Sequence, residues 1–563
     1  ANTSGHYNVA IGTEVMRCAT TGQHNTGVGS FALYSNTTGG SNAAIGPYAL
    51  GDNTGGSYNS GMGHSALKSN KTGSYNVGIG AYAVYGNTTG AYNVGIGNQA
   101  LKCNIAGYWN NAIGMYALYN NLSACYNNAI GYSALCDNTT GTDNNALGRC
   151  ALYRNTTGNN NTAIGQSALC SNTTGSCNIA LGRDALRVSL SGDHNFAAGQ
   201  CSLYSNWGGC YNTAIGQNSL KCNTTGCGNI AIGQTYGGTL GKNTTGYDNV
   251  AFGGLAENTT GYGNFAANGA MGKNTEGHYN VGIGTSALGW NTTGTNNVAV
   301  GWRALLNNTT GSDNNAIGYA ALCRNTTGGS NNVIGRGMTY NTTGCFNTAI
   351  GSGALNANTT GCNNFAAGNS ALYGNQVGHS NIAIGHSSLV TSTSGSHNIA
   401  LGECAQRLGG TTGSWNTALG NLALYSNTTG CNNNAIGYAA LYCNTTGDHN
   451  TALGYQSLYF NVSGDRNFAA GPYALCKNTG GCCNTAIGGG ALANNSYGSD
   501  NTAIGTSALA YNTTGNCNTA IGYKASLNNT TGCRNVAIGE YTSYANTTGN
   551  CNVGIGYRPL YAN

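Results

Sequence analysis

The sequence predicts an all-β protein, a parallel β-solenoid (β-roll) of about 33 coils with about 17 residues, two short strands and two turns per coil. A turn sequence of the type Asn-Thr-Thr-Gly recurs along the whole chain. Between successive turns lie two short apolar segments, too short for ordinary helices. Glycine supplies 93 of the 563 residues, and only 6% are charged, against about 25% in a typical soluble domain. The regular period excludes a disordered low-complexity chain.

The repeat keeps its register over most of the chain. The turns recur every 17 residues from position 2 to position 223. Their spacing becomes irregular around 240–345, and one additional residue lies near Gly410. We interpret residues 1–563 as a single continuous repeat array in which terminal caps, tip or anchor domains are not present. Because repeat arrays need caps, we expect flanking segments in a longer protein.

Counted from the turn Asn as position 1, the unit has the consensus N-T-T-G-x-x-N-x-A-I-G-x-x-A-L-x-x. Positions 1–4 predict a turn, in which Asn and Thr side chains bond local backbone groups and Gly supplies a positive φ. Position 11 is Gly almost throughout and becomes Asn268 once, which predicts a left-handed residue at a second corner. Positions 7–10 and 12–15 are expected to form the two strands.

Correlated substitutions predict which side chains point inward. Where position 8 becomes Phe, position 10 shrinks to Ala, so we expect positions 8 and 10 to share a crowded interior face. Position 9, nearly always Ala or Gly, would face the other way, against another chain or a tight bend of the same coil. The predicted core includes Ile45, Leu50, Ile164, Leu169, Phe196, Ile215, Leu220, Phe365 and Phe468.

A single coil has too small a core to be stable alone. Burying an Ile or Leu contributes about 1.5 to 3 kcal/mol, whereas ordering each residue costs about 1.5 kcal/mol. We therefore expect stability from backbone ladders between coils, from ladders of the Asn at position 7, and from neighbouring chains. At about 4.8 Å per coil, 33 coils would extend over about 160 Å.

The chain has 23 cysteines, and several recur in adjacent coils. Stacked coils would place such residues about 4.8 Å apart, within the range of Cα separations in disulfides. Metal binding is the alternative, but the spacing of zinc sites is lacking. Disulfides would indicate an extracellular compartment. The candidate disulfide residues are Cys210, Cys227, Cys345, Cys362, Cys517, Cys533, Cys551 and Cys222, the last of which flanks one turn together with Cys227.

Position 1 also creates N-x-[ST] glycosylation sequons in most coils. The simpler interpretation is that Asn-Thr-Thr-Gly forms a good turn; if the sites were modified, a row of glycans would follow one edge. The candidate sites are Asn36, Asn87, Asn138, Asn155, Asn172, Asn223, Asn291, Asn308, Asn427, Asn444, Asn512 and Asn546.

Tyrosines recur in single columns, one with Tyr425, Tyr442 and Tyr459 and another with Tyr544 and Tyr561. Exposed aromatic columns can stack on sugar rings, although lateral packing is the more common role. Histidines of the turn column are expected to be solvated; examples are His194, His397 and His449.

No pattern of residues predicts an enzyme, a cofactor or a metal site. The 15 acidic residues form no recurrent pair of the kind that glycoside hydrolysis needs. The net charge of +5 includes no run of Lys or Arg that would follow a phosphate backbone, so we expect no nucleic-acid partner. No apolar stretch approaches the roughly 20 residues that span a bilayer.

The motif N-[TV]-A-I-G, seen at Asn161–Gly165, Asn212–Gly216 and Asn535–Gly539, resembles the S-V-A-I-G motif of trimeric autotransporter adhesin heads. The wider pattern N-T-T-G-x-x-N-T-A-I-G-x-x-A-L is even more similar to the repeat arrays of phage tail-fibre proteins. The resemblance extends over essentially the whole chain. It implies a homotrimeric parallel β-roll that serves in binding to host or cell surfaces.

Two functions are therefore expected. The first is a structural extracellular fibre, a stiff spacer in surface attachment at a cell or virion surface; the second is a building block of a long sheath or matrix filament. An ice-binding solenoid is a distant third, because consecutive Thr residues in a turn do not form one flat array. The expected partners are further copies of the chain, as a homo-oligomer or filament, and surface glycans.

Overall fold

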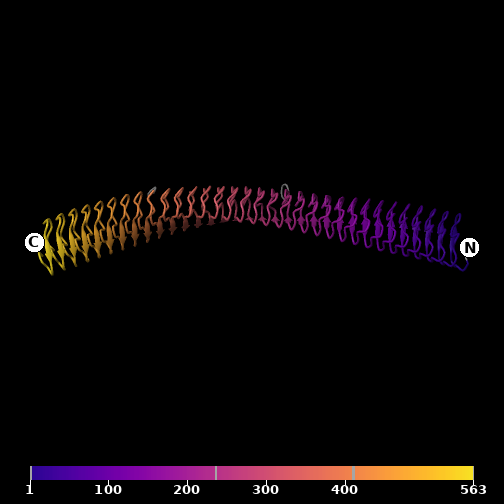
Figure 1. Ribbon diagram of the computed structural model, residues 1–563, viewed down its shortest axis with the longest axis horizontal. Helices are drawn as coiled ribbons and strands as arrows, with labels where there is room; N and C mark the ends of the chain where they lie inside the picture. The colour runs from indigo at the N-terminus through magenta and orange to yellow at the C-terminus, as the bar shows by residue number, and fades with distance from the viewer. Residues whose placement is uncertain (1–2, 235–237, 409–411, 562–563) are drawn as a thin grey trace. The chain divides into compact units, whose positions relative to one another are not determined.

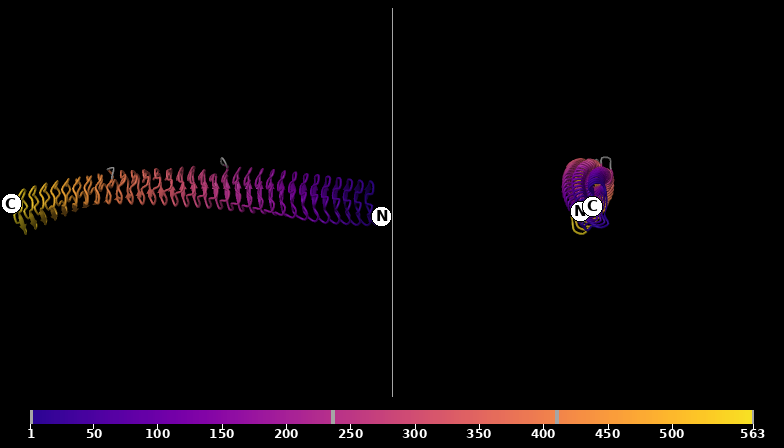
Figure 2. Two further views of the ribbon diagram at one scale, coloured as in Figure 1. Left: turned by 45° about the horizontal axis from the view of Figure 1, so that its top comes forward. Right: turned by 90° about the vertical axis from the view of Figure 1, so that its right-hand side faces the viewer.

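The computed structural model describes residues 3–234, 238–408 and 412–561. The chain forms two compact units, residues 1–280 (unit 1) and 281–563 (unit 2). Each unit is a stack of similar coils, one strand to a coil (Figures 1 and 2). Every regular element in the described residues is a short strand, and no helix occurs among them.

The strands of unit 1 are β1 (Val9–Ile11), β2 (Thr26–Val28), β3 (Ala43–Ile45), β4 (Ser60–Met62), β5 (Val77–Ile79), β6 (Val94–Ile96), β7 (Asn111–Ile113), β8 (Asn128–Ile130), β9 (Asn145–Leu147), β10 (Thr162–Ile164), β11 (Ile179–Leu181), β12 (Phe196–Ala198), β13 (Thr213–Ile215), β14 (Ile230–Ile232), β15 (Val250–Phe252) and β16 (Phe265–Ala267).

The strands of unit 2 are β17 (Val281–Ile283), β18 (Val298–Val300), β19 (Asn315–Ile317), β20 (Asn332–Ile334), β21 (Thr348–Ile350), β22 (Phe365–Ala367), β23 (Ile382–Ile384), β24 (Ile399–Leu401), β25 (Thr417–Leu419), β26 (Asn434–Ile436), β27 (Thr451–Leu453), β28 (Phe468–Ala470), β29 (Thr485–Ile487), β30 (Thr502–Ile504), β31 (Thr519–Ile521), β32 (Val536–Ile538) and β33 (Val553–Ile555).

Within each unit, consecutive strands pair in parallel and in register. Asn111 of β7, for example, lies beside Asn128, the corresponding residue of β8 in the next coil. This arrangement confirms the predicted parallel β-solenoid and the predicted length of its coil.

The second predicted strand, at positions 12–15, was wrong, because this segment forms consecutive turns. In the coil that begins at Asn36, Tyr48 and Leu50 have φ values of 60° and 51°, which an extended strand does not allow. The cause is the adjacent pair Ala-Leu, both of whose side chains are fully buried at Ala49 and Leu50. Neighbouring residues of a strand point to opposite faces, so only a curled backbone directs both inward.

The assignment of the interior face was also wrong. The middle residue of every strand from β2 to β33, position 9, is buried, and the flanking positions 8 and 10 point outward. Positions 8 and 10 do share a face, but substitution in pairs does not show on which side of the strand that face lies. The three leucines predicted for the core, Leu50, Leu169 and Leu220, are fully buried. The residues wrongly assigned to the core are Ile45, Ile164, Ile215, Phe196, Phe365 and Phe468.

Position 9 is small because the Leu at position 15 of the preceding coil packs against it. A Cβ added to Gly78 would lie 3.2 Å from Cγ of Leu67, so nothing much larger than Ala fits. Val333, the exception, is accompanied by Gly337 where other coils have Ala, and a Cβ on Gly337 would lie 3.3 Å from Cγ1 of Val333. The small side chains therefore reflect a narrow core within one chain rather than contact between chains.

Glycine has different roles at the two positions of the coil where it recurs. At position 11 it is left-handed, as in Gly46 with φ of 128°, and Asn268 replaces it with φ of 57°, as predicted. At position 4 the expected positive φ is absent, and close approach is the reason for glycine. A Cβ on Gly56 would lie 2.2 Å from the carbonyl oxygen of Gly73 in the next coil.

Irregular coils keep the same ladders, because their extra or missing residues fall between strands. Coil lengths of 20, 15 and 16 residues separate the bonded asparagines Asn223, Asn243, Asn258 and Asn274. The additional residue expected near Gly410 lies outside the described residues.

Candidate functional site

A ladder of asparagines at position 1 runs through the interior. Nδ2 of Asn53 donates to Oδ1 of Asn36 in the preceding coil at 2.7 Å and to the carbonyl of Gly56 in its own coil at 3.0 Å. The position-1 Asn therefore connects neighbouring coils as well as closing its own turn. This ladder was not predicted, although the Asn is almost as constant at position 1 as at position 7.

A second ladder, at position 7, confirms the prediction for that asparagine. Oδ1 of Asn42 accepts from the backbone N–H and from Nδ2 of Asn59, at 2.9 and 3.1 Å. Nδ2 of Asn59 also donates to the carbonyl of Gly73 at 2.8 Å, and that carbonyl accepts from Asn70 of the first ladder at 2.9 Å. The position-4 carbonyl therefore links both ladders. In a regular coil the buried amides at positions 1 and 7 and this carbonyl all have hydrogen-bond partners.

The position-1 ladder is interrupted where serine replaces asparagine. Ser189 and Ser392 are fully buried, and their hydroxyls have no hydrogen-bond partner. In the preceding coils, Oδ1 of Asn172 and Oδ1 of Asn375 also lack a partner. The shorter serine side chain does not reach the acceptor in the preceding coil, so each break leaves unpaired polar atoms in the core.

The candidate glycosylation sites are not accessible in the folded chain. A glycan on Nδ2 would replace a hydrogen that the position-1 amide donates in the interior, as Asn87 does to Oδ1 of Asn70. The twelve side chains are at most 5% exposed: Asn36, Asn87, Asn138, Asn155, Asn172, Asn223, Asn291, Asn308, Asn427, Asn444, Asn512 and Asn546.

All 23 cysteines are free thiols, so the predicted disulfides are absent from the structure. At position 5 the thiol is a hydrogen-bond acceptor: Sγ of Cys227 accepts the backbone N–H of Cys210 at 3.1 Å, and Sγ of Cys362 accepts that of Cys345 at 3.2 Å. Ser57 performs the same role for Gly40 at 3.0 Å. Cysteine therefore replaces a hydroxyl in a side-chain ladder.

The remaining candidate cysteines do not form one column. Cys517 and Cys551 occupy position 6 of their coils, whereas Cys533 occupies position 5 and belongs to the acceptor ladder, where its Sγ accepts the N–H of Asn516. Cys222 ends a coil and is exposed, and its backbone N–H bonds the carbonyl of Gly241. The predicted series was therefore out of register by one position.

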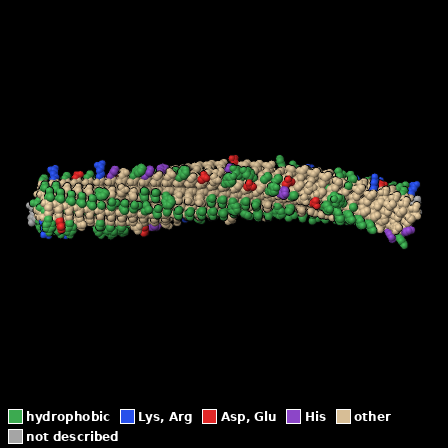
Figure 3. Space-filling model, turned by 60° about the horizontal axis from the view of Figure 1, so that its bottom comes forward, with side chains coloured by type: hydrophobic (Ala, Val, Ile, Leu, Met, Phe, Trp, Pro, Cys, Tyr) green, Lys and Arg blue, Asp and Glu red, His purple; other side chains and the backbone are tan. Residues whose placement is uncertain are grey.

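The first and third residues of every strand form what we call the outer sheet face. Its third residue is usually Ile or Leu and remains well exposed, as in Ile45 (44%), Ile164 (42%) and Ile504 (37%). Rows of hydrophobic side chains follow the stacking direction in each unit (Figure 3). Isolated exposed apolar residues are ordinary, whereas rows of them that repeat from coil to coil are typical of interaction surfaces.

The tyrosine columns are stacked within the chain. The ring centroids of Tyr425, Tyr442 and Tyr459 are 4.8 and 4.9 Å apart, with planes within 2° of parallel, and Tyr544 stacks on Tyr561 at 5.1 Å. Since neighbouring rings cover each other's faces, an inner ring has no free face for a sugar. The columns therefore act in packing between coils.

The three histidines of the turn column are exposed, as predicted, and two of them stack on an aromatic ring of the next coil. His194 lies on Tyr211 at 4.9 Å and His397 on Trp415 at 4.0 Å, while the backbone of His449 bonds the carbonyl of Cys431. Within the described ranges, no group of three His, Cys, Asp or Glu side chains is placed to hold a metal ion. Nor is any helix there long and apolar enough to cross a bilayer.

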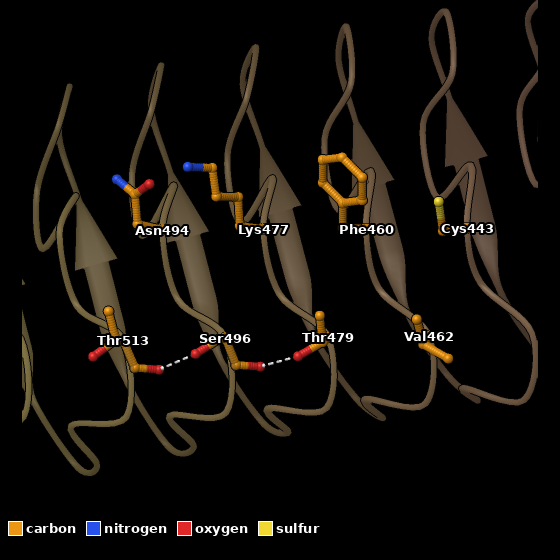
Figure 4. Close-up of a pocket in the computed structure, with 8 residues that line it drawn as sticks. All are labelled: Cys443, Phe460, Val462, Lys477, Thr479, Asn494, Ser496 and Thr513. Atoms are coloured by element: carbon orange, nitrogen blue, oxygen red, sulfur yellow. Dashed lines mark hydrogen bonds between the residues drawn. The ribbon is translucent and has the colours of Figure 1, made fainter.

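A shallow groove of about 630 Å³ lies on unit 2 between two rows of side chains (Figure 4). One row consists of Cys443, Phe460, Lys477 and Asn494 at the ends of their coils, and the other of Val462, Thr479, Ser496 and Thr513 at position 2. The hydroxyls of the second row donate along the stack, Thr479 to the carbonyl of Ser496 at 2.9 Å. Because these hydroxyls are committed to the backbone, position 2 does not present a free array of Thr side chains.

In comparisons with known proteins, neither any family model nor any curated protein matches the chain.

Proposed function

We propose that the chain is a structural spacer of an extracellular attachment fibre, of the viral tail-fibre or adhesin-like kind, and that copies of it associate through the outer sheet face. The observation that carries the proposal is this face itself, which repeats an exposed Ile or Leu in most coils. The repeat resemblance of the sequence supports an attachment role and a homo-oligomer.

The interior of each unit supports a mechanical role. Two asparagine ladders and the backbone bonds connect neighbouring coils, so that separating two coils breaks many hydrogen bonds at once. The bonds repeat along the stack, as at Asn53, Asn70 and Asn87. Such an array resists bending and stretching without any catalytic centre.

The exposed third residues of the outer sheet face supply a substantial part of the area that a stable association needs. Full burial of an Ile contributes about 1.5 to 3 kcal/mol, which at about 25 cal/mol per Å² corresponds to about 60 to 120 Å². Ten of the 16 third residues of unit 1 are large hydrophobic side chains about two fifths exposed; these offer about 240 to 480 Å², and a standard interface buries about 800 Å² per partner. The first residues of the strands add to this.

A second copy of the chain is the partner that fits. The rows repeat at the strand spacing of about 4.8 Å, so a partner can match them over many coils only if it has the same period. An ordinary globular surface would match over one or two coils. Two copies would not repel each other electrostatically through this face, because the strands contain no charged residue.

Electron microscopy of the source material, with an antibody against the repeat, tests the function. Label on virion tails, or on short rods at a cell surface, would support the attachment fibre. Label along indefinitely long free filaments would refute it and make the chain the building block of a sheath or matrix polymer. Sedimentation of the purified chain tests association separately, and a monomer at micromolar concentration would refute the role of the outer sheet face.

A further inference from the structure

Three arginines of unit 2 line one hollow in its surface. The hollow has a volume of about 450 Å³ and adjoins a second of about 230 Å³, with which it shares Arg336, Asn356 and Tyr373. Arg303 and Arg324 complete the cationic lining. Together the two volumes are within the range of about 300 to 1,000 Å³ found for small-molecule sites.

An irregular coil creates the hollow. The coil that begins at Asn325 has 16 residues, and Nδ2 of Asn341 bonds Oδ1 of Asn325 across it. The missing residue shortens the turn segment 336–340, while the coils on both sides keep full length. The wall is therefore recessed at this coil, between side chains that project from its neighbours.

The cationic groups are not neutralised by the protein. Between residues 281 and 400 the sequence has only these three Arg, no Lys, and Asp313 as the one acidic residue. Asp313 belongs to another column, where Nδ2 of Asn296 donates to it. Within the described residues, none of the three arginines is in an ion pair or donates a side-chain hydrogen bond.

Cys323 lines the same hollow as the three arginines. Burial raises the pKa of this thiol, and the positive charges of Arg324, Arg303 and Arg336 all act to lower it. Three cations that line one hollow create a positive potential in it, with which a bound anion would interact favourably.

Aromatic rings hold the arginines in place. The ring of Tyr319 stacks on Trp302 at 4.7 Å, and the guanidinium carbon of Arg336 lies 5.7 Å from the centre of the Tyr319 ring. The guanidinium carbon of Arg303 is 4.2 Å from the Trp302 ring, and that of Arg324 is 4.4 Å from Tyr340. Cation–π contacts of this kind orient the planar fork for bidentate recognition.

The remaining polar lining suits hydroxyl groups. Asn307, Asn356 and Thr339 contribute amides and a hydroxyl, and the Thr339 hydroxyl donates to Oδ1 of Asn356. An acidic sugar needs only an anionic group for the arginines and hydroxyls for the amides.

We propose that this hollow, bounded by Arg303, Arg324 and Arg336, binds an acidic saccharide through its sulfate or carboxylate group. The site goes beyond the proposed function, because it would bind the sugar whether the chain serves an attachment fibre or a free filament.

Isothermal titration calorimetry of the full chain tests the site with three probes: a sulfated heparin disaccharide, a galacturonate disaccharide and lactose. We expect an acidic disaccharide to bind with one site per chain and lactose not to bind. A sulfate-only or carboxylate-only result would support the proposal and identify the group recognised. Absence of binding by both acidic probes would refute the proposal.

Two sets of variants locate the site. Each of Arg303→Gln, Arg324→Gln and Arg336→Gln is expected to weaken binding at least about tenfold, because a charged hydrogen bond is lost. A triple variant combines the three changes. Its matched control changes Arg149, Arg466 and Arg534, which lie outside the hollow, to Gln, so that both triple variants have the same net charge. Equal weakening by the two triple variants would show attraction by net charge alone and refute the site. Binding of the acidic disaccharide should also change the tryptophan fluorescence of the chain, and this change should disappear in Trp302→Phe.

Discussion

The breaks in the position-1 ladder predict a stabilising substitution, Ser189→Asn. The introduced amide would donate to Oδ1 of Asn172, which has no partner, and to the carbonyl of Gly192, and its oxygen would accept from Asn206. Neighbouring coils already accommodate Asn at this position in the same surroundings. Three hydrogen bonds at about 0.5 to 1.5 kcal/mol each, less about 1 kcal/mol of side-chain entropy, give about 0.5 to 3.5 kcal/mol.

Amide hydrogen exchange is the appropriate assay, because a long array does not unfold in one step. Peptides within residues 172–206 should exchange about 2 to 300 times more slowly, since about 1.4 kcal/mol corresponds to a factor of ten. Ser191→Asn is the matched control, as Ser191 lies on the surface of the same turn. If Ser189→Asn slows exchange no more than Ser191→Asn, the ladder does not stabilise the coils and the reasoning fails.

The remaining predictions concern close packing, thiols and association. Gly56→Ala should destabilise its coil by more than about 2 kcal/mol, because the Cβ would meet the Gly73 carbonyl, whereas Gly489→Ala should change exchange little because the nearest atom is 3.8 Å away. Cys227→Ser should retain stability under oxidising conditions, since Ser fills the same ladder role; a loss of about 3 kcal/mol would instead indicate a disulfide. Burial raises the pKa of Cys136 to about 12, so its alkylation at pH 8 should be far slower than that of exposed Cys517, and equal rates would refute the burial. Because the folded form holds this proton more tightly, the stability contributed is complete below the ordinary thiol pKa of about 8.5 and falls as pH rises from there towards about 12. Replacing Ile487, Ile504 and Ile521 by Ser should weaken self-association measured by sedimentation. The control replaces Leu122, Leu190 and Val462, which are similarly exposed but do not belong to the outer sheet face, by Ser and should leave self-association unchanged.

The coil, its period and its glycine corner could be predicted from the sequence because each depends on local chemistry repeated many times. Asn268 in place of Gly identified the left-handed corner, and the constant Asn at position 7 indicated a ladder. The direction of the strand faces could not be predicted, because paired substitutions such as Phe196 with Ala198 are equally consistent with an inner or an outer face. The adjacent Ala-Leu pair was the signal that positions 12–15 curl, and it was interpreted as a strand.

The arginine hollow could not be predicted because its residues occupy different positions of successive coils. The separations between Arg303, Arg324 and Arg336 along the chain are not multiples of the period. Their proximity depends on which turn residues project and on the one residue that the coil at Asn325 lacks. A search for residues that depart from the period, rather than for those that follow it, would have found the shortened coil.

The position-4 carbonyl, which accepts from both asparagine ladders, has a consequence for how such genes change. A regular coil presents the same donors on one side and the same acceptors on the other, so any such coil can follow any other. Unequal crossing-over that adds or removes whole coils would leave each new junction fully bonded, and the length of the protein can vary without change to its interior. Coils of 15 to 20 residues in this chain indicate that surface insertions are accommodated as well. New binding sites can therefore arise in single coils while the rest of the array is inherited unchanged.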